Sequence, residues 1–370
     1  YKIQTFTDHL RLEALFLENA EPTSPFGTKA LGEPPACPPA PAIRNAVMQA
    51  TGIAFNAIPI TPDHKAIVQS EPAPIEKPYD IKALYEARTV AEAAELRLAH
   101  PEAVVIAGGS DVLIKLREGK MPGAELISIR DIAPLRGVSM DAAGTLKIGP
   151  LTTFSELTAD ALIREHVPTL GQAADEVGSP QIRNIGTVGG NICNGVTSAD
   201  TAPTLFAFDA EVELTGTEGA RRIAIADFYL GPGRTDVRPG ELLTGIYIPR
   251  ESWERTAGRY IKYSMRTALD IATLGCSVNV RLALDRESIE RVRIAYGVAG
   301  PVPCRCPEAE AAFAGAPCTD ETARAFARAA VAEINPRDSW RASKAFRQHI
   351  AEECAYRALR ESVERAGGAI

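Results

Sequence analysis

Short apolar runs alternate with helical patterns from residue 79 to about residue 250. The apolar runs predict strands at 104–106, 126–129, 146–148, 212–214, 223–225 and 243–248. Thr89 and Glu92 have the spacing of a capping box, which predicts a helix to about Leu98, and a second helix is expected around 170–177. Strands that alternate with helices are typical of α/β structure, so we expect a two-part α/β domain over 79–250.

The pattern changes near residue 260. Alternating apolar and polar positions predict antiparallel strands at 277–284 and 292–298. Helical periodicity then predicts helices at 321–334 and 343–366, with Pro336 between them. We therefore expect an α+β chain, in which a C-terminal α+β domain with an antiparallel sheet occupies 255–370.

Residues 1–70 do not have the pattern of a self-sufficient domain. They contain a proline-rich loop at 22–41 and one helical pattern at 42–50, which together bury too little surface to offset chain entropy. We expect this segment to be a tail that docks on another surface, and residues 71–78, rich in proline, to be a stiff linker. Because the chain opens with Tyr1, we also expect that residues precede it or that it is a piece of a larger polypeptide.

Composition narrows the function classes. A chain of 370 residues is expected to form two or three domains, and its net charge of −7 argues against general nucleic-acid binding. The sequence has no apolar run long enough for a membrane span. Seven irregularly spaced cysteines and no secretory leader favour reduced thiols in the cytoplasm. Cys304, Cys306 and Cys318 lack the spacing of zinc or iron–sulfur ligands, so loop cysteines are favoured over a metal site.

Two glycine-rich stretches about eighty residues apart carry the strongest chemical signal. The first, 107–111, follows the predicted strand at 104–106, and the second, 186–191, precedes the polar segment 197–200. Glycines let backbone N–H groups approach a bound anion closely. The first stretch alone could be an ordinary βα turn, and the G-x-G-x-x-G fingerprint of nicotinamide-binding Rossmann domains is absent. Together the two stretches favour one large phosphorylated cofactor that is held from two sides.

Three ordered motifs carry a family resemblance. VIAGGSDVLIKLREG, IRNIGTVGGNI followed by SADTAP, and KYSMRTALDIA resemble the FAD-binding chain of the molybdenum hydroxylases, a family that includes xanthine dehydrogenase, carbon monoxide dehydrogenase and 4-hydroxybenzoyl-CoA reductase. The resemblance runs from about Tyr79 to the C-terminus. It implies FAD-binding residues at Val105, Ile106, Ala107, Gly108, Gly109, Ser110, Asp111, Val112, Thr187, Val188, Gly189, Gly190 and Asn191.

The resemblance also implies roles for three residues outside the glycine stretches. Asp200 would hydrogen-bond a cofactor hydroxyl or the phosphate neighbourhood, Leu242 would border the path from isoalloxazine to adenine, and Lys262 would place a positive charge near the flavin. The alternative for Lys262 is a solvated charge on a strand. Arg266 and Asp270 would then form a surface ion pair of little energetic value.

The N-terminal tail carries a separate resemblance. PFGTKALGEPPACPPAPAIRNAV resembles the C-terminal end of the molybdenum-binding subunit of the same family, and Glu33 matches the glutamate that acts there as general base beside molybdenum. Rigid prolines would fix this carboxylate, and partial burial would raise its pKa toward a value useful near neutral pH. Thr28 and Lys29 would lie near the cofactor rim. The sequence leaves open whether the tail is a fusion or a split of a larger subunit.

Together these features predict an FAD-carrying electron-transfer subunit of a heteromeric molybdenum hydroxylase that also contributes Glu33 to the molybdenum site. The resemblance implies a large subunit with the molybdopterin-type cofactor, a small subunit with [2Fe-2S] clusters, and an external electron acceptor such as NAD. One alternative is a stand-alone FAD oxidoreductase of related fold. The other is a scaffold subunit that has lost FAD. The sequence names neither the substrate nor the acceptor.

Overall fold

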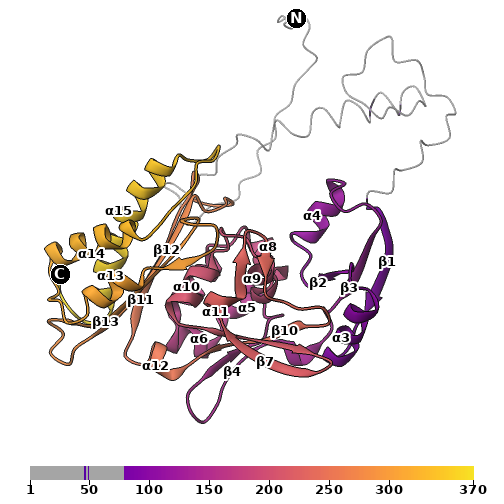
Figure 1. The fold of residues 1–370 in the computed structure, drawn as a ribbon, viewed down its shortest axis with the longest axis horizontal. Helices are drawn as coiled ribbons and strands as arrows, with labels where there is room; N and C mark the ends of the chain where they lie inside the picture. The colour runs from indigo at the N-terminus through magenta and orange to yellow at the C-terminus, as the bar shows by residue number, and fades with distance from the viewer. Residues whose placement is uncertain (1–45, 47–48, 50–78) are drawn as a thin grey trace, which may run out of the picture. The chain divides into compact units, whose positions relative to one another are not determined.

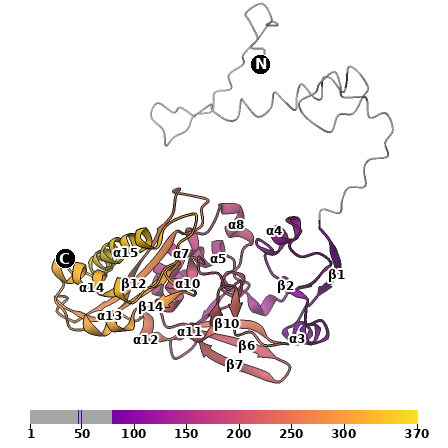
Figure 2. The same ribbon diagram turned by 45° about the horizontal axis from the view of Figure 1, so that its top comes forward.

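The computed structural model describes residues 79–370 together with Ala46 and Gln49, which are both helical. The linker and almost all of the N-terminal tail, including Glu33 and most of the helix predicted at 42–50, lie outside the described residues. Residues 78–370 form one compact unit. Its elements fall into three groups that follow one another along the chain (Figures 1 and 2).

The first group is a small parallel sheet with two helices. It contains β1 (Ile81–Glu86), α3 (Val90–Ala99), β2 (Val104–Ile106), α4 (Val112–Arg117) and β3 (Ala124–Ser128), and its strands lie in the order β1-β3-β2. Thr89 caps α3 as predicted, because its hydroxyl accepts the Glu92 N–H at 3.1 Å. The Glu92 carboxylate accepts the backbone N–H of Arg88 rather than that of Thr89. The C-terminal end of β2 leads directly into the first glycine stretch.

The second group is built on a five-stranded antiparallel sheet. Its strands are β4 (Val138–Met140), β5 (Leu146–Ile148), β6 (Glu211–Gly216), β7 (Gly219–Ala224) and β10 (Leu242–Ile248), in the order β4-β5-β10-β6-β7. The strand predicted at 223–225 ends at Ala224, because Ile225 begins the short helix α11 (Ile225–Phe228). A two-stranded hairpin, β8 (Tyr229–Gly231) and β9 (Arg234–Thr235), follows α11.

Helices fill the long connection between β5 and β6. They are α5 (Phe154–Ala159), α6 (Ala161–His166), α7 (Pro168–Asp175), α8 (Pro180–Ile185), α9 (Val188–Cys193) and α10 (Thr201–Ala207). The first core cluster joins the sheet to these helices through fully buried side chains such as Ile148, Leu157, Leu170, Ile192 and Leu205. The second glycine stretch is thereby part of a helical layer rather than a free loop.

The third group is a four-stranded antiparallel sheet covered by helices, as the sequence predicts. After α12 (Arg250–Trp253) come β11 (Ala257–Tyr263), β12 (Leu274–Leu282), β13 (Ile289–Gly297), β14 (Cys304–Arg305), α13 (Pro307–Ala312), α14 (Asp320–Ala332) and α15 (Lys344–Arg365). Helix α15 packs on β11 and β12, and α7 and α10 also contact the sheet, so β12 is buried along nearly its whole length. The α+β class is confirmed.

Two expectations from the sequence concern membrane-spanning helices and metal sites. Among the described residues, no helix is long and apolar enough to cross a membrane, and no group of three metal-ligating side chains comes together. Cys306 is buried and its thiol donates to the carbonyl oxygen of Ala330 at 3.4 Å, which gives it a packing role.

Candidate functional site

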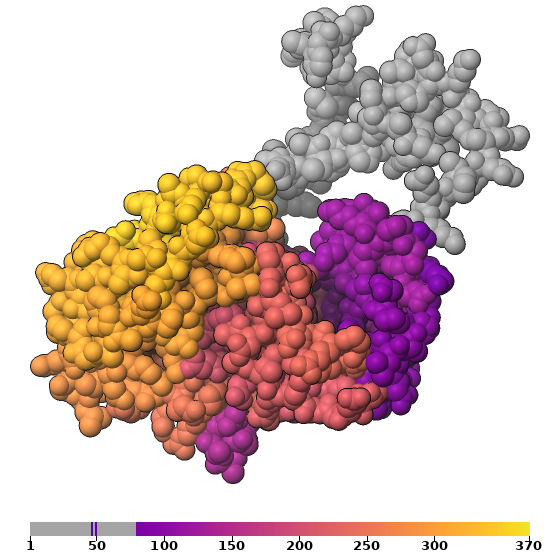
Figure 3. All heavy atoms as spheres, in the orientation of Figure 1, coloured from indigo at the N-terminus to yellow at the C-terminus, as the bar shows by residue number. Residues whose placement is uncertain are grey.

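A cavity of about 760 Å³ lies between the parallel sheet of the first group and the helices and sheet of the second. It opens on the surface as the recess between the indigo and the salmon parts of Figure 3. Its walls come from β2 and the glycine stretch after it, from α8 and α9, from the β8–β9 hairpin and from the start of β10. This volume is within the range of small-molecule and cofactor sites in proteins.

The two glycine stretches meet at this cavity. A Cβ atom at Gly108 would lie 1.9 Å from the carbonyl oxygen of Ile185, at the end of α8. Gly109 has φ +75°, a conformation that residues with side chains rarely adopt. Two stretches that are eighty residues apart in sequence are therefore in backbone-to-backbone contact, and only glycine at position 108 permits it.

The first stretch presents backbone donors that find no partner in the part of the chain that the structure describes. Among the described residues, no backbone oxygen accepts a hydrogen bond from the N–H groups of Gly108, Gly109, Ser110 or Asp111. All four residues line the cavity. Successive unpaired N–H groups in such a turn form a concavity suited to an anion, so this stretch has the geometry expected of a phosphate-binding turn.

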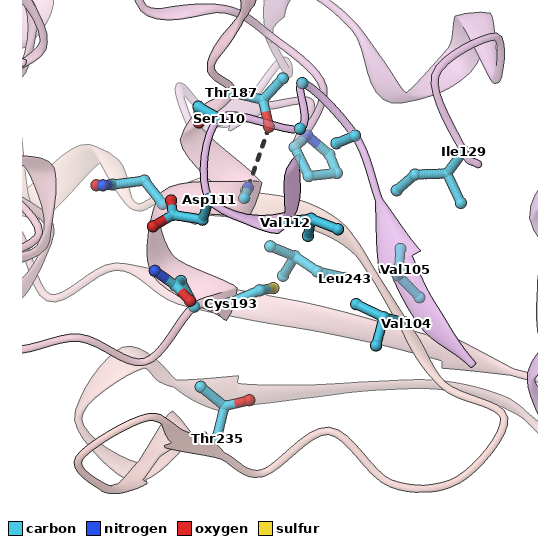
Figure 4. A pocket seen from close by; sticks show the side chains of 18 of the residues that line it. Val104, Val105, Ser110, Asp111, Val112, Ile129, Thr187, Cys193, Thr235 and Leu243 are labelled. Carbon is cyan, nitrogen blue, oxygen red and sulfur yellow. Dashed lines mark hydrogen bonds between the residues drawn. The ribbon is translucent and has the colours of Figure 1, made fainter. Parts of the chain in front are cut away.

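In the second stretch, by contrast, the corresponding donors are already used. The N–H groups of Val188 and Gly189 donate to the carbonyls of Thr152 and Pro150 at 3.0 and 2.9 Å. The Gly190 N–H donates to the Thr187 hydroxyl at 3.1 Å, the bond drawn dashed in Figure 4. These bonds fix α9 against the turn before α5, and they leave side chains, rather than N–H groups, to face the cavity.

Asn191 is the polar side chain that α9 offers to the cavity. Its Oδ1 accepts a hydrogen bond from the hydroxyl of Thr201 at 2.7 Å, and Thr201 is fully buried at the start of α10. With the oxygen occupied, the amide NH₂ group remains as the donor. Thr201 therefore sets the orientation of Asn191.

Apolar side chains line another part of the cavity. Figure 4 shows Val104 and Val105 of β2 opposite Thr235 of β9, with Leu243 of β10 and Cys193 of α9 between them. Burial raises the pKa of Cys193 to about 12, so this thiol stays protonated at neutral pH. The cavity thus combines a polar rim with a largely apolar floor, as a cofactor with both phosphate and ring systems requires.

Asp200 and Lys262 lie in a separate buried cluster. Lys262 on β11 donates to the Asp200 carboxylate at 2.9 Å and to the carbonyl of Glu176 at 2.8 Å, and the hydroxyl of Tyr260 donates to the other Asp200 oxygen at 2.8 Å. The side chains of Lys262 and Asp200 are only 5% and 8% exposed. Burial raises the pKa of Asp200 to about 6, although Lys262 and Tyr260 act in the opposite direction. The interpretation of Lys262 as a solvated charge is wrong.

The structure brings most of the predicted site residues together. The cavity is lined by Val105, Ala107, Gly108, Gly109, Ser110, Asp111, Val112, Thr187, Gly189, Gly190, Asn191 and Leu242. Of the others, Ile106 packs in a small core cluster beneath the turn and Val188 is fully buried in the main one. Asp200 and Lys262 form the separate cluster, and their predicted contacts with a cofactor stay predictions.

Sequence reasoning missed the residues on the far wall. Arg97 of α3 and the residues of the β8–β9 hairpin, including Gly233, Arg234 and Thr235, also line the cavity. Glu241, the residue before β10, is held by Arg221, whose Nε and Nη2 donate to its two carboxylate oxygens at 2.7 and 2.8 Å. The Gly231–Gly233 pair was the available sequence signal for a turn that approaches a ligand.

Comparison with protein families decides the class of this site. Residues 78–251 match the FAD binding domain in molybdopterin dehydrogenase, and residues 259–362 match the CO dehydrogenase flavoprotein C-terminal domain. The chain belongs to the FAD-binding subunits of the molybdopterin dehydrogenase family. It is therefore a flavoprotein subunit of an oxidoreductase, as the sequence motifs predict.

Relatives and solved structures agree with this assignment. The xanthine dehydrogenase FAD-binding subunit of Escherichia coli O157:H7 is 38% identical over 290 residues, which cover 78% of this chain and 99% of the relative. The nicotinate dehydrogenase FAD-subunit of Eubacterium barkeri is 32% identical over 60% of this chain and 75% of its own length. Carbon monoxide dehydrogenase from Hydrogenophaga pseudoflava contains a chain that superimposes with a TM-score of 0.72 at 29% identity, over 78% of this chain and 99% of that one.

The residues of the cavity fit FAD. The unpaired N–H groups of Gly108 to Asp111 are donors suited to a diphosphate. The Asn191 amide adds a side-chain donor, and the valines and leucines of β2 and β10 offer apolar surface for a ring system. The Nε atom of Arg97 is buried without a partner among the described residues, and its guanidinium adds a positive charge to the cavity wall.

Proposed function

We propose that this chain is the FAD-carrying electron-transfer subunit of a heteromeric molybdenum hydroxylase. The observation that carries the proposal is the row of four unpaired N–H groups at Gly108–Asp111, which faces a cavity of about 760 Å³. When bound, FAD supplies the redox chemistry, in which electrons from molybdenum and [2Fe-2S] clusters on partner chains leave for an external acceptor such as NAD.

The two glycine stretches have different tasks in this proposal. Gly108, Gly109, Ser110 and Asp111 would hold the diphosphate through their backbone N–H groups, while the segment Thr187–Asn191 would add the Asn191 amide. Leu242 lines the cavity and would offer apolar surface to the ring systems of the cofactor. Preorganised donors of this kind bind and orient a cofactor without rearrangement.

The partners in the proposal are a large molybdenum-binding subunit and a small [2Fe-2S] subunit. Support comes from the relatives, among which is a solved Cu,Mo-CO dehydrogenase that contains a chain 26% identical to this one with a TM-score of 0.73. The resemblance of the tail to a molybdenum-binding subunit adds Glu33 as the general base that completes the partner's site. In that role Glu33 accepts the proton released as substrate is attacked.

The experiment is a visible spectrum and metal analysis of the complex that co-purifies with the full chain. Flavin absorbance with an iron–sulfur contribution, and molybdenum near one atom per chain, is the expected result. Flavin without metals or partners would instead support the stand-alone flavoprotein, and a colourless chain would support the scaffold.

A second experiment tests Glu33. Glu33→Gln should leave the FAD, iron and molybdenum content unchanged and abolish flavin reduction by substrate. Because the relatives act on xanthine, nicotinate and carbon monoxide according to their names, these three are the first substrates to assay. Glu71→Gln, in the linker, is the matched control and should reduce normally. Equal turnover in both variants would show that Glu33 is not the base.

A further inference from the structure

Arg97 is a guanidinium at the cavity wall for which the described residues provide no salt bridge. It lies in the last turn of α3 and lines the cavity. Its Nε is buried and finds no acceptor among the described residues. Burial lowers the pKa of Arg97, but from so high a starting value that the group stays charged at neutral pH. A buried, charged donor without an acceptor is costly, so a partner is expected.

The neighbouring protein groups do not supply that partner. Glu241 is the nearby carboxylate, but both of its oxygens are already bonded by Arg221, at 2.7 and 2.8 Å. The Cys193 thiol is the other close group, and its raised pKa of about 12 keeps it neutral. The positive charge of Arg97 is therefore directed at whatever occupies the cavity.

We infer that Arg97 is a cofactor-binding residue whose guanidinium pairs with the diphosphate of FAD. The inference rests on the proposed function, because it takes FAD as the occupant. The diphosphate carries two negative charges, and the N–H groups of Gly108–Asp111 supply hydrogen bonds but no net charge. A guanidinium offers a planar fork of donors that matches phosphate oxygens, which an ammonium cannot reproduce.

Two other cations line the cavity, and both are poorer candidates. Lys115 donates to Asn194 Oδ1 at 3.2 Å and is exposed. Arg234 is also exposed, at the tip of the β8–β9 hairpin. Exposed charges are screened by water and salt, whereas a partly buried one is screened much less. Arg97 is thus the cation expected to contribute most to binding of the anionic cofactor.

The test is titration of the deflavinated full chain with FAD, FMN and riboflavin, followed by flavin fluorescence. Arg97→Gln should weaken FAD binding by about 10- to 100-fold, the effect of one charge-assisted hydrogen bond. The affinity of Arg97→Gln for riboflavin, which has no phosphate, should be close to that of wild type. The salt dependence of FAD binding should be weaker in Arg97→Gln than in wild type. Arg97→Lys should fall between wild type and Arg97→Gln. Arg88→Gln, which removes an exposed charge just before α3, is the control and should bind FAD normally.

Thermal unfolding separates this role from a purely structural one. Because Arg97 has no hydrogen-bond partner among the described residues, Arg97→Gln should be at least as stable as wild type without FAD, and FAD should raise its melting temperature less. Equal FAD affinity in Arg97→Gln and wild type would overturn the inference. Equal losses for FAD and riboflavin, or an unstable flavin-free variant, would also overturn it. If wild type itself fails to bind FAD, the proposed function falls instead.

Discussion

The buried pair of Lys262 and Asp200 gives a prediction whose size follows from the structure. Lys262 joins three elements, because its ammonium bonds the end of α7 through Glu176 and the start of α10 through Asp200, while its own strand is β11. Lys262→Met would leave a carboxylate that is 8% exposed with the Tyr260 hydroxyl as its remaining partner. Removing one partner of a buried ion pair costs about 3–5 kcal/mol.

The stability that Lys262→Met loses should depend on pH, and the raised pKa of Asp200 determines whether it grows or shrinks as the pH rises. The pKa of Asp200 is about 6 in the folded protein, and the ordinary value for an aspartate is 3.8. Removing Lys262 should raise it further. Between the two values the folded state binds a proton that the unfolded state does not, so stability falls as pH rises through this window. Lys262→Met should therefore lose less stability at pH 5 than at pH 8.

Denaturation by urea and by heat, at pH 5 and at pH 8, measures both effects. At pH 8 the melting temperature should fall by about 10 °C, at about 2–4 °C for each kcal/mol in domains of comparable size. The double variant Lys262→Met with Asp200→Asn should recover most of the loss, because no charge is left buried. Lys120→Met, at a side chain that is 67% exposed, is the surface control. A Lys262→Met variant as stable as Lys120→Met at pH 8 would contradict a stabilising buried pair, and so would a double variant that is no more stable than the single one.

Two further predictions concern the cavity. Gly108→Ala should lose bound FAD and about 1–3 kcal/mol of stability, because its Cβ would lie 1.9 Å from the Ile185 carbonyl oxygen. Gly190→Ala should have a smaller effect, because its Cβ would meet only a side-chain oxygen at 3.0 Å. The FAD content and the urea denaturation of both variants test this difference. Thr201→Val should lower the free energy of unfolding by about 1 kcal/mol and weaken FAD binding several-fold, because Asn191 Oδ1 loses its hydrogen-bond donor. An unchanged FAD affinity in a flavin titration would contradict the orienting role of Thr201.

Local patterns predicted the parts of the fold that depend on local sequence. The strand at 104–106, the cap at Thr89 and the two C-terminal helices were confirmed with small shifts at their ends. Strand β11 was missed, and so were the short helices between β5 and β6 other than α7, because runs of six or seven residues hold too few turns for a clear period. The antiparallel order β4-β5-β10-β6-β7 joins strands that are about ninety residues apart, which no local window reports.

The site residues also fall into those that local sequence predicts and those that depend on contacts between distant residues. Gly109, with its positive φ, and the unpaired donors of its neighbours follow from glycine chemistry that the sequence displays. The role of Arg97 at the cavity could not be predicted from the sequence. It depends on the finding that no described residue, near or distant in sequence, accepts a hydrogen bond from its Nε. Lys262 and Asp200 were each predicted to act on the cofactor, and their mutual contact across sixty residues was not foreseen.

The two glycine stretches require glycine for different reasons, and this changes how loss of FAD in a variant is explained. A Cβ at Gly189 would lie 2.4 Å from the side chain of Pro150, and one at Gly108 would lie 1.9 Å from a backbone oxygen. Both glycines therefore permit chain segments to approach each other, so a side chain at either position would displace protein backbone or side chains. A valine at position 189 would displace α9 from Pro150, and with it the Asn191 amide. Such a variant is expected to lose FAD through a distorted wall, so its unfolding free energy should fall together with its FAD affinity. Arg97→Gln is expected to lose FAD affinity alone. The comparison of these two variants separates residues that build the cavity from residues that bind its occupant.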